Sequence, residues 1–254
     1  MVIDDVLLHS YEMYSSSKAF NAANLTLNLG NNHFKNDMLS QLTSLFLHIN
    51  RLSRLELSSI FSDSDWMNFA KLSDLPKLME LSFRYTNRQT FDYCHFDPFF
   101  EAKRTLTHLD LSSCGLTADD MIGLSHSLDH LLKLKKLTLD SNPMIGVKGL
   151  NYLDGVVEKS KVDILEITNC GISDEGIQLI VRWIYRLRSL DVSQNRDLRL
   201  SQTDIDKLSD ILNNEKMPRR IILDDFRKES PAKIFGLSFQ PNSQFSGSPF
   251  EADQ

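Results

Sequence analysis

Apolar residues recur along this chain in one short pattern. In the clearest copies, an apolar residue is followed by others three and five positions later, and by Asn or Cys three positions after that. These copies are LTHLDLSSC (106–114), LKKLTLDSN (134–142), VDILEITNC (162–170) and LRSLDVSQN (187–195). With less regular copies there are seven, whose ninth residues are Asn32, Ile60, Thr86, Cys114, Asn142, Cys170 and Asn195. The intervals of 28, 26, 28, 28, 28 and 25 residues indicate a repeat array.

This spacing resembles the leucine-rich-repeat consensus, in which a short strand turns its leucines inward and an Asn or Cys then bends the chain. A weaker eighth copy, PRRIILDDF, follows at 218–226. The pattern predicts eight parallel strands at 27–29, 55–57, 81–83, 109–111, 137–139, 165–167, 190–192 and 221–223.

Two of the turns are followed by apolar residues at helical spacing. These are Met121, Leu124 and Leu128 in one segment, and Ile177, Ile180 and Ile184 in the other. Thr117 and Ser173 precede acidic residues and fit helix starts. A 28-residue period with a helix in each unit is typical of ribonuclease-inhibitor-like repeats. We therefore expect an α/β horseshoe with right-handed crossovers, a concave parallel sheet and helices on the outside.

The repeats divide the chain into three parts. Residues 1–20 occupy the helix position of a preceding unit and are expected to form a helical cap. Residues 21–228 form the solenoid, in which each repeat packs against its neighbours. Residues 229–254 are rich in Ser, Pro and Phe without periodicity, and we expect a largely disordered tail.

Composition narrows the function classes. The chain has 28 Lys and Arg against 34 Asp and Glu, and this net charge of -6 argues against a general phosphate-backbone binder. No segment has the length of a membrane span or the features of a signal peptide, so we expect no membrane partner. Three cysteines without a CxxC motif favour an intracellular, reducing compartment.

The cysteines in the turns have a structural interpretation. Cys114 and Cys170 share the ninth position with asparagines, so their side chains should be buried, reduced and bonded to the turn backbone. Two repeats should separate them by roughly 10 Å, beyond the reach of a disulfide. Cys94 beside His95 is a weak signal for a metal ligand or nucleophile. Since no catalytic or cofactor motif is present, we expect neither an enzyme nor a cofactor or metal.

The concave face offers a candidate partner surface. Between the second and third apolar positions stand Asn28, Glu56, Ser82, Asp110, Thr138, Glu166 and Asp191, and four of these seven are acidic. Asp140 extends the acidic row, and Arg54 stands one column earlier. This row is either an ordinary solvated face or a docking site for a basic partner that relieves carboxylate repulsion. Reversing Glu56, Asp110, Glu166 and Asp191 to Lys should then abolish binding and leave the fold intact.

The third repeat carries a crowd of aromatic residues between positions 86 and 106. Phe96, Phe99 and Phe100 either fill the space beside a shortened helix or form an exposed anchor for a partner. We also count Arg84 and Tyr85, which directly follow the third strand, among the candidate partner-binding residues.

Several segments resemble the C-terminal leucine-rich repeats of Tonsoku-like proteins: 17–45, 52–67, 134–153, 187–212 and the run FRKESPAKIF at 226–235. Matches outside the leucines are Ala19-Phe20, the ELSS run and Asn142-Pro143. The resemblance covers most of residues 15–236. It implies nuclear docking of a large helical scaffold of the methyl-methanesulfonate-sensitivity type in recombination repair at stalled replication forks. The tetratricopeptide, histone-reading ankyrin and ubiquitin-like segments of that family are absent from these residues, so histone reading is not implied.

The sequence thus predicts a protein-binding scaffold without sequence-specific nucleic-acid contacts. The alternative is another intracellular adaptor of the same repeat class, with an actin-regulatory, GTPase-regulatory or ubiquitin-ligase role. An actin regulator would need amphipathic actin-binding helices, and a ligase receptor would need an F-box or cullin box.

Overall fold

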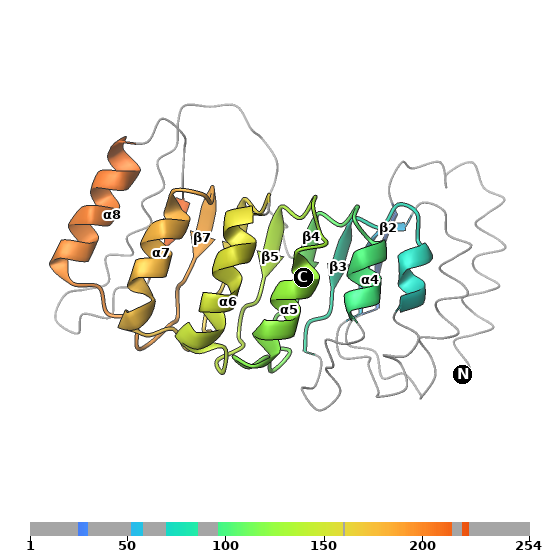
Figure 1. Cartoon of the computed structure of the whole chain (residues 1–254), viewed down its shortest axis with the longest axis horizontal. Coiled ribbons are helices and arrows are strands. Elements are labelled where there is room, and N and C mark those ends of the chain that lie inside the picture. Colours follow the sequence, from blue (N-terminus) through green and yellow to red (C-terminus); the bar gives the residue numbers. More distant parts are fainter. Residues whose placement is uncertain are drawn as a thin grey trace, which may run out of the picture.

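The protein is an open array of strands backed by helices (Figure 1). The computed structural model describes residues 25–29, 52–57, 70–85, 96–159, 161–214 and 220–223. The strands are β1 Leu25–Asn28, β2 Leu52–Glu56, β3 Glu80–Ser82, β4 His108–Asp110, β5 Lys136–Thr138, β6 Ile164–Glu166, β7 Ser189–Asp191 and β8 Arg220–Ile222. They form one parallel sheet in the order in which they occur along the chain. All eight predicted strands are confirmed. Each begins one to three residues earlier than predicted and ends one residue earlier than predicted.

The helices lie on one face of the sheet (Figure 1). They are η2 Ala70–Asp74, α4 Phe96–Ala102, α5 Asp120–Leu128, α6 Gly146–Lys159, η5 Asp174–Gly176, α7 Ile177–Ile184 and α8 Gln202–Asn214, where η marks a 3-10 helix. The predicted start of α5 is confirmed, since Asp120 accepts the Thr117 N–H at 2.8 Å and donates its own N–H to the Thr117 hydroxyl at 3.4 Å. Ser173 instead precedes η5 and forms no side-chain cap.

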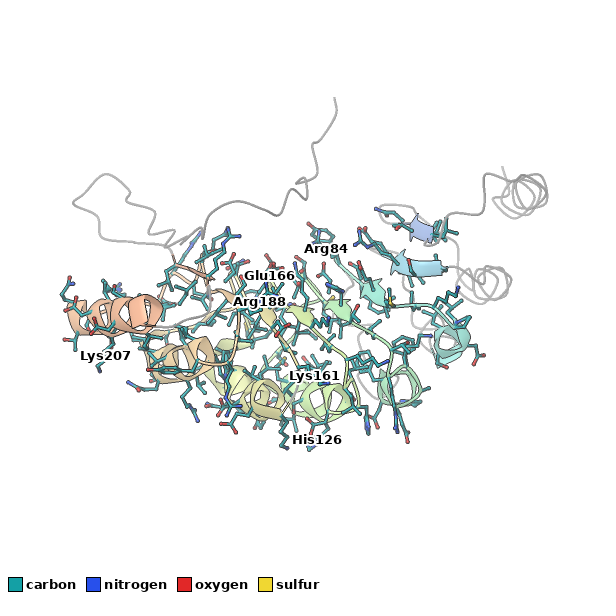
Figure 2. The ribbon with its side chains drawn as sticks, turned by 90° about the horizontal axis from the view of Figure 1, so that it is seen from above. Arg84, His126, Lys161, Glu166, Arg188 and Lys207 are labelled. Carbon is teal, nitrogen blue, oxygen red and sulfur yellow. The ribbon has the colours of Figure 1, made fainter. Side chains whose placement is uncertain are left out.

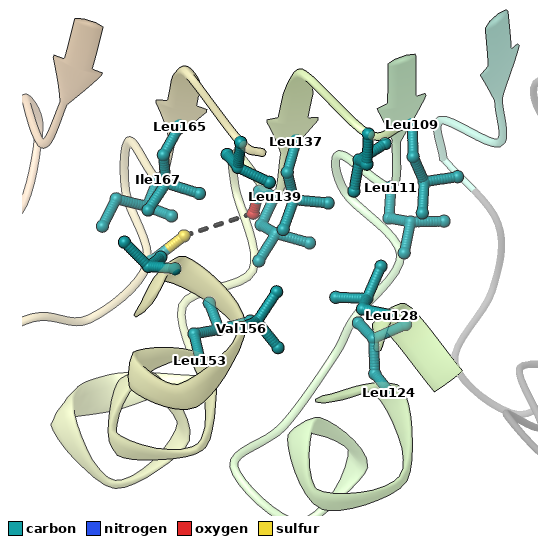
Figure 3. Packing of buried hydrophobic residues seen from close by; sticks show 14 of the residues in the cluster. Leu109, Leu111, Leu124, Leu128, Leu137, Leu139, Leu153, Val156, Leu165 and Ile167 are labelled. Atoms are coloured by element: carbon teal, nitrogen blue, oxygen red, sulfur yellow. Dashed lines mark hydrogen bonds between the residues drawn. The ribbon is translucent and has the colours of Figure 1, made fainter. Parts of the chain in front are cut away.

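The core lies between the sheet and the helices. Consecutive strands place leucines in register, as in the column Leu81, Leu109, Leu137, Leu165 and Leu190. Leu109, Leu137 and Leu165 of this column face the apolar sides of α5 and α6 (Figure 3). Each repeat buries its apolar side chains against its neighbours, as expected for a solenoid.

Some predictions fall outside the described residues. They are the helical cap at 1–20, the tail at 229–254, Cys94 with His95, and the ninth-position residues Asn32, Ile60 and Thr86. They stay predictions.

Candidate functional site: the concave face of the sheet

Two rows of polar side chains cross the face of the sheet opposite the helices. The inner row follows the register Asn28, Glu56, Ser82, Asp110, Thr138, Glu166, Asp191 and Ile222. The outer row follows the register Thr26, Arg54, Glu80, His108, Lys136, Ile164, Ser189 and Arg220. Figure 2 shows Arg84 and Glu166 on this side of the array. The expected columns are therefore present.

The carboxylates are less crowded than the sequence suggested. Ser82 lies between Glu56 and Asp110, and Thr138 lies between Asp110 and Glu166. Within the described sheet, only Glu166 and Asp191 are inner-row carboxylates in register on adjacent strands. Mutual repulsion along the row is thus largely avoided by spacing.

Three cations on this face pair with carboxylates of the next strand. Arg54 on β2 contacts Glu80 on β3, and the Arg84 Nε lies 2.6 Å from the Asp110 Oδ2 on β4. The Lys136 Nζ on β5 lies 2.8 Å from the Glu166 Oε1 on β6. Each bridge links one repeat to the following one. Exposed pairs of this kind contribute only about 0.2–1 kcal/mol each, so their main effect is to orient the side chains.

Neutral groups hold the remaining oxygens. Asn28 donates to the Glu56 Oε2 at 2.9 Å, and the Thr138 hydroxyl donates to the Glu166 Oε2 at 2.9 Å. The Asp110 Oδ1 accepts both the backbone N–H and the hydroxyl of Ser112, at 3.0 and 2.6 Å. Asp191 makes the same two bonds to Ser193 at 3.0 and 2.7 Å. Asp110 and Asp191 therefore stabilise their own turns, and the expectation that all four acids can be reversed without cost to the fold needs correction.

Asp140 is partly buried and bonds to the following repeat. Its Oδ1 accepts the Thr168 backbone N–H at 2.7 Å, which links two repeats. Burial raises the pKa of this carboxyl, and the nearby charges of Glu166 and Asp191 add to the increase, whereas the bond from Thr168 opposes it. Asp140 thus has a structural bond as well as a place in the acidic row.

His108 lies in the outer row between Glu80 and Lys136. Its Nδ1 is 2.9 Å from the Thr107 hydroxyl and 3.8 Å from the Glu80 carboxylate. Partial burial lowers the pKa of the imidazole, and Lys136 and Arg54 add to the decrease against the opposing charge of Glu80. The ring is therefore mainly neutral at neutral pH.

Ser82 has a feature that the sequence did not indicate. Its hydroxyl oxygen is buried and has no hydrogen-bond partner in the part of the chain that the structure describes. The Ser112 and Ser193 hydroxyls, which follow β4 and β7, are each held by the aspartate two positions before them. Ser82 is in register with Asp110 and so stands at a different position of its repeat.

Tyr85 combines exposure with an unfavourable backbone conformation. Its φ is +59°, in the left-handed region, and its side chain is 61 % exposed. Four later turns place Ser113, Ser141, Asn169 and Gln194 in the same conformation. A bulky residue is rare there, and the conformation costs roughly 1–2 kcal/mol for a residue other than glycine. Tyr85 therefore presents its ring to solvent at a position where the other described repeats have small or polar residues.

The aromatic anchor has to be corrected. Phe99 and Phe100 lie in α4 with 0 % exposed surface, and their rings pack at a centroid distance of 5.4 Å. These two rings fill the space beside a seven-residue helix, which is the packing interpretation, and neither can contact a partner in this conformation. The side chain of Phe96 lies outside the described residues.

The ninth-position residues bind backbone, as predicted. Asn142 accepts the Leu116 N–H at 3.0 Å and donates to the carbonyls of Leu111 and Leu139 at 3.0 and 2.7 Å. The Cys170 Sγ donates to the Leu139 carbonyl at 3.2 Å (dashed line in Figure 3), and the Cys114 Sγ donates to the Phe83 carbonyl at 3.0 Å. Both thiols are reduced and buried. Burial raises the pKa of Cys170 to about 12, so the thiol is uncharged and unreactive.

Lys103 is a buried cation that sequence reasoning missed. Its Nζ donates to the carbonyls of Leu75 and Ser73, just beyond and within η2, and the side chain comes from the residue that follows α4. Burial lowers the pKa of this ammonium group, and Asp74 opposes that effect. The lysine caps the C-terminal end of a helix in the preceding repeat. A lysine after a short helix gives no sequence signal for such a role.

The described residues contain no group of three or more His, Cys, Asp or Glu placed to hold a metal ion. They also contain no helix long and apolar enough to cross a membrane.

A match to a protein family supports the repeat class. A family model described as Leucine Rich repeat matches residues 102–125 and 159–181, which contain β4 and β6 with their turns. The leucine-rich repeat-containing protein LegL7 from Legionella pneumophila is 15% identical, with 72% of this chain and 70% of that chain covered and a TM-score of 0.49. A TLR13-ssRNA13 complex is 15% identical, with 57% and 19% covered and a TM-score of 0.35. The family match and the eight in-register strands give the conclusion that the chain contains leucine-rich repeats, folded as an open horseshoe-like α/β array.

Proposed function

We propose that the chain is a non-enzymatic scaffold that binds a protein partner across its concave face. The observation that supports this most strongly is the set of cross-strand pairs that fix polar side chains along the exposed sheet. Side chains that are already ordered lose little entropy on binding, which favours affinity. A rigid, polar and continuous face of this kind suits a folded partner better than a small molecule, which would require an enclosed pocket.

The face has a modest acidic excess. The two rows, with Arg84 and Asp140, contain six carboxylates and four Lys or Arg side chains. We propose a partner surface with more cations than anions, whose arginines share the carboxylates of Glu56, Asp110, Glu166 and Asp191. Tyr85 and Arg84, which follow β3, would form a binding hot spot of this interface, because Tyr and Arg are enriched at hot spots. Tyr85 would supply its aromatic contact.

For the biological role, we propose the docking of a large helical repair scaffold that supports recombination at stalled replication forks in the nucleus. The support for this role is the resemblance of residues 15–236 to Tonsoku-like repeats. Another adaptor of the same repeat class is the alternative, with an actin-regulatory, GTPase-regulatory or ubiquitin-ligase partner. Identification by mass spectrometry of the protein that co-purifies with the tagged full chain separates these roles, because each names a different class of partner.

Binding between the purified partner and the full chain then tests the face itself. A variant with Glu56→Lys and Glu166→Lys should weaken binding by about tenfold or more, because like charges would then face a basic partner. The matched control is Glu158→Lys with Glu175→Lys, which changes the net charge equally on the exposed helical side. Asp110 and Asp191 are left unchanged because their carboxylates hold turns. Equal affinity of the two variants would contradict the concave-face proposal.

Tyr85→Asn tests the aromatic contact separately. Asn tolerates the left-handed conformation better than Tyr, so the thermal midpoint should stay equal or rise. Partner affinity should nevertheless fall, because the exposed ring is lost. Unchanged affinity would show that Tyr85 lies outside the interface. The rest of the face is tested by the charge-reversal variant.

A further inference from the structure

The edge of the sheet at which the strands begin is strongly basic. Because all strands are parallel, the five described connections that enter β3 to β7 lie along this one edge. They are residues 75–79, 103–107, 129–135, 161–163 and 185–188, and they contain eight Lys or Arg and only two Asp. The connections at the opposite edge, at 111–119, 139–145, 167–173 and 192–201, contain two Arg and three Asp. A chain with a net charge of -6 thus concentrates positive charge along one side.

Seven of the eight cations are exposed, and Lys103 is the buried exception. The seven, which we call the basic edge, are Lys77, Arg104, Lys133, Lys135, Lys161, Arg186 and Arg188. Figure 2 looks along the strands and labels Lys161 and Arg188 of this set. None of the seven forms an ion pair within the described ranges, whereas Arg54, Arg84 and Lys136 on the concave face are all paired. The cations of the basic edge are therefore available to pair with anionic groups of a ligand.

Exposed apolar side chains lie among these cations. Leu132 is 60 % exposed directly before Lys133, and Tyr185 is 51 % exposed directly before Arg186. Met79, two residues after Lys77, is also exposed. A ligand that uses the whole edge must offer apolar groups as well as anions.

The surroundings favour a narrow ligand over a flat one. The helices end at this same edge, and they place the exposed acids Glu101 of α4 and Glu158 of α6 beside the cations. A broad anionic surface such as a lipid bilayer would meet these acids too. A single extended chain can instead follow the strand side of the edge, across neighbouring connections that are about 5 Å apart.

We propose that the basic edge binds an extended acidic polypeptide segment with apolar residues among its Asp and Glu. A nucleic-acid strand fits less well, because Asp163 interrupts the row and because stacking of successive bases uses several aromatic rings. Of the three exposed apolar side chains described at this edge, only Tyr185 has such a ring, and Leu132 and Met79 do not. This site is separate from the concave face, so one scaffold would hold two partner segments. It goes beyond the protein-binding function proposed above and does not depend on it.

Fluorescence anisotropy on the full chain tests the proposal with a labelled twelve-residue peptide of repeated Glu-Glu-Leu. The wild type should bind it in low salt and release it as salt increases, because exposed charges are screened. A variant with Lys133→Glu, Lys135→Glu and Lys161→Glu should weaken binding by about tenfold or more. The matched control, Arg196→Glu, Arg199→Glu and Lys207→Glu, changes the net charge equally at exposed positions away from the edge and should bind as the wild type does.

Four further probes decide which ligand class fits. A Gln-Gln-Leu peptide should not bind, and a Glu-Glu-Ser peptide should bind several-fold more weakly than the Leu version because Leu132 and Tyr185 lose their contacts. Oligo(dT) and vesicles of phosphatidylcholine with phosphatidylserine should bind more weakly than the acidic peptide. Tighter binding of either, or an equal loss in the control variant, would overturn the proposal. Circular dichroism on both triple variants ensures that a loss of folding is not scored as a loss of binding.

Discussion

The turns beneath the sheet and the concave face above it use polar side chains in opposite ways. In the turns, buried side chains bind backbone groups of the preceding repeat: Asn142 reaches Leu111 and Leu116, and Asn195 reaches Ile167 and Cys170. On the concave face, exposed side chains mainly bind one another. A hydrogen bond away from water is costly to leave unmade, and one in water is easily replaced. Stability should therefore depend on the turns, and recognition should depend on the face.

The largest effect should come from an asparagine turn. Asn142 is fully buried, and Asn142→Ala leaves the Leu116 N–H and the Leu111 carbonyl without their partner. Since each unsatisfied buried group costs about 1–3 kcal/mol, we expect the free energy of unfolding to fall by about 3 kcal/mol. Urea denaturation measures it. A fall in the free energy of unfolding of less than about 1 kcal/mol would show that the turn relaxes or admits water. The turns would then not differ from the concave face in their effect on stability.

A cysteine turn should tolerate change better. The Cys170 thiol donates to the same carbonyl position as Asn142 does, but sulfur makes weaker bonds. Cys170→Ala should cost about 1–2 kcal/mol, and Cys170→Asn should cost less, because an amide in this slot can restore the backbone bonds.

Thiol labelling gives an independent check on that turn. With its pKa raised to about 12, Cys170 should not react with a thiol reagent at pH 8 until the protein unfolds. Rapid labelling of Cys170 in the folded protein would contradict the burial of this thiol. Cys170→Ser distinguishes its signal from that of the other cysteines.

Exposed pairs should matter least for stability. Lys136→Met removes the bridge to Glu166, and we expect a loss within about 0.2–1 kcal/mol that shrinks as salt is added. The double-mutant cycle with Glu166→Gln isolates the pair. A coupling energy above about 2 kcal/mol would mean that the face supports the fold as strongly as the turns do.

Asp140 lies between the two extremes, and its effect should appear as a dependence on pH. Its pKa is raised above 3.8 in the folded protein, so the folded state holds the proton more tightly than the unfolded state does. Its contribution to stability is then full below pH 3.8 and is lost as pH rises through the raised pKa. The difference in unfolding free energy between wild type and Asp140→Asn should change in that window and stay constant above it. A difference that moves in the opposite direction would mean that the bond from Thr168 outweighs burial.

The sequence predicts the interior of this fold better than its surface. Leucines at fixed spacing locate every strand because one face must be buried, and the pattern places each strand slightly late because it marks the leucines and not the first ladder bond. The roles of Cys114 and Cys170 are also predictable, since they stand in an asparagine position. The concave columns follow from strand alternation alone.

Features that depend on side-chain reach were not predictable. The bridge from Arg84 to Asp110 joins residues 26 apart, and nothing in the spacing separates it from a solvated arginine. The burial of Phe99 and Phe100 depends on where a short helix begins. Lys103 looks like its exposed neighbour Arg104, yet only one of them enters the core. Such outcomes depend on three-dimensional neighbours that a periodic pattern does not specify.

The direction of the salt bridges gives the array an order. On the concave face each described bridge from a Lys or Arg runs to a carboxylate one repeat later, as from Arg84 to Asp110 and from Lys136 to Glu166. On the helical side they run one repeat back, as from Lys148 to Asp119 and from Arg182 to Asp154. Deleting the unit 106–133 would keep the leucine column, but it would bring Thr138 to the place of Asp110 beside Arg84. Units of this array could therefore be exchanged without loss of the leucine column, yet a unit moved to another place would lose the bridges that it forms with its present neighbours.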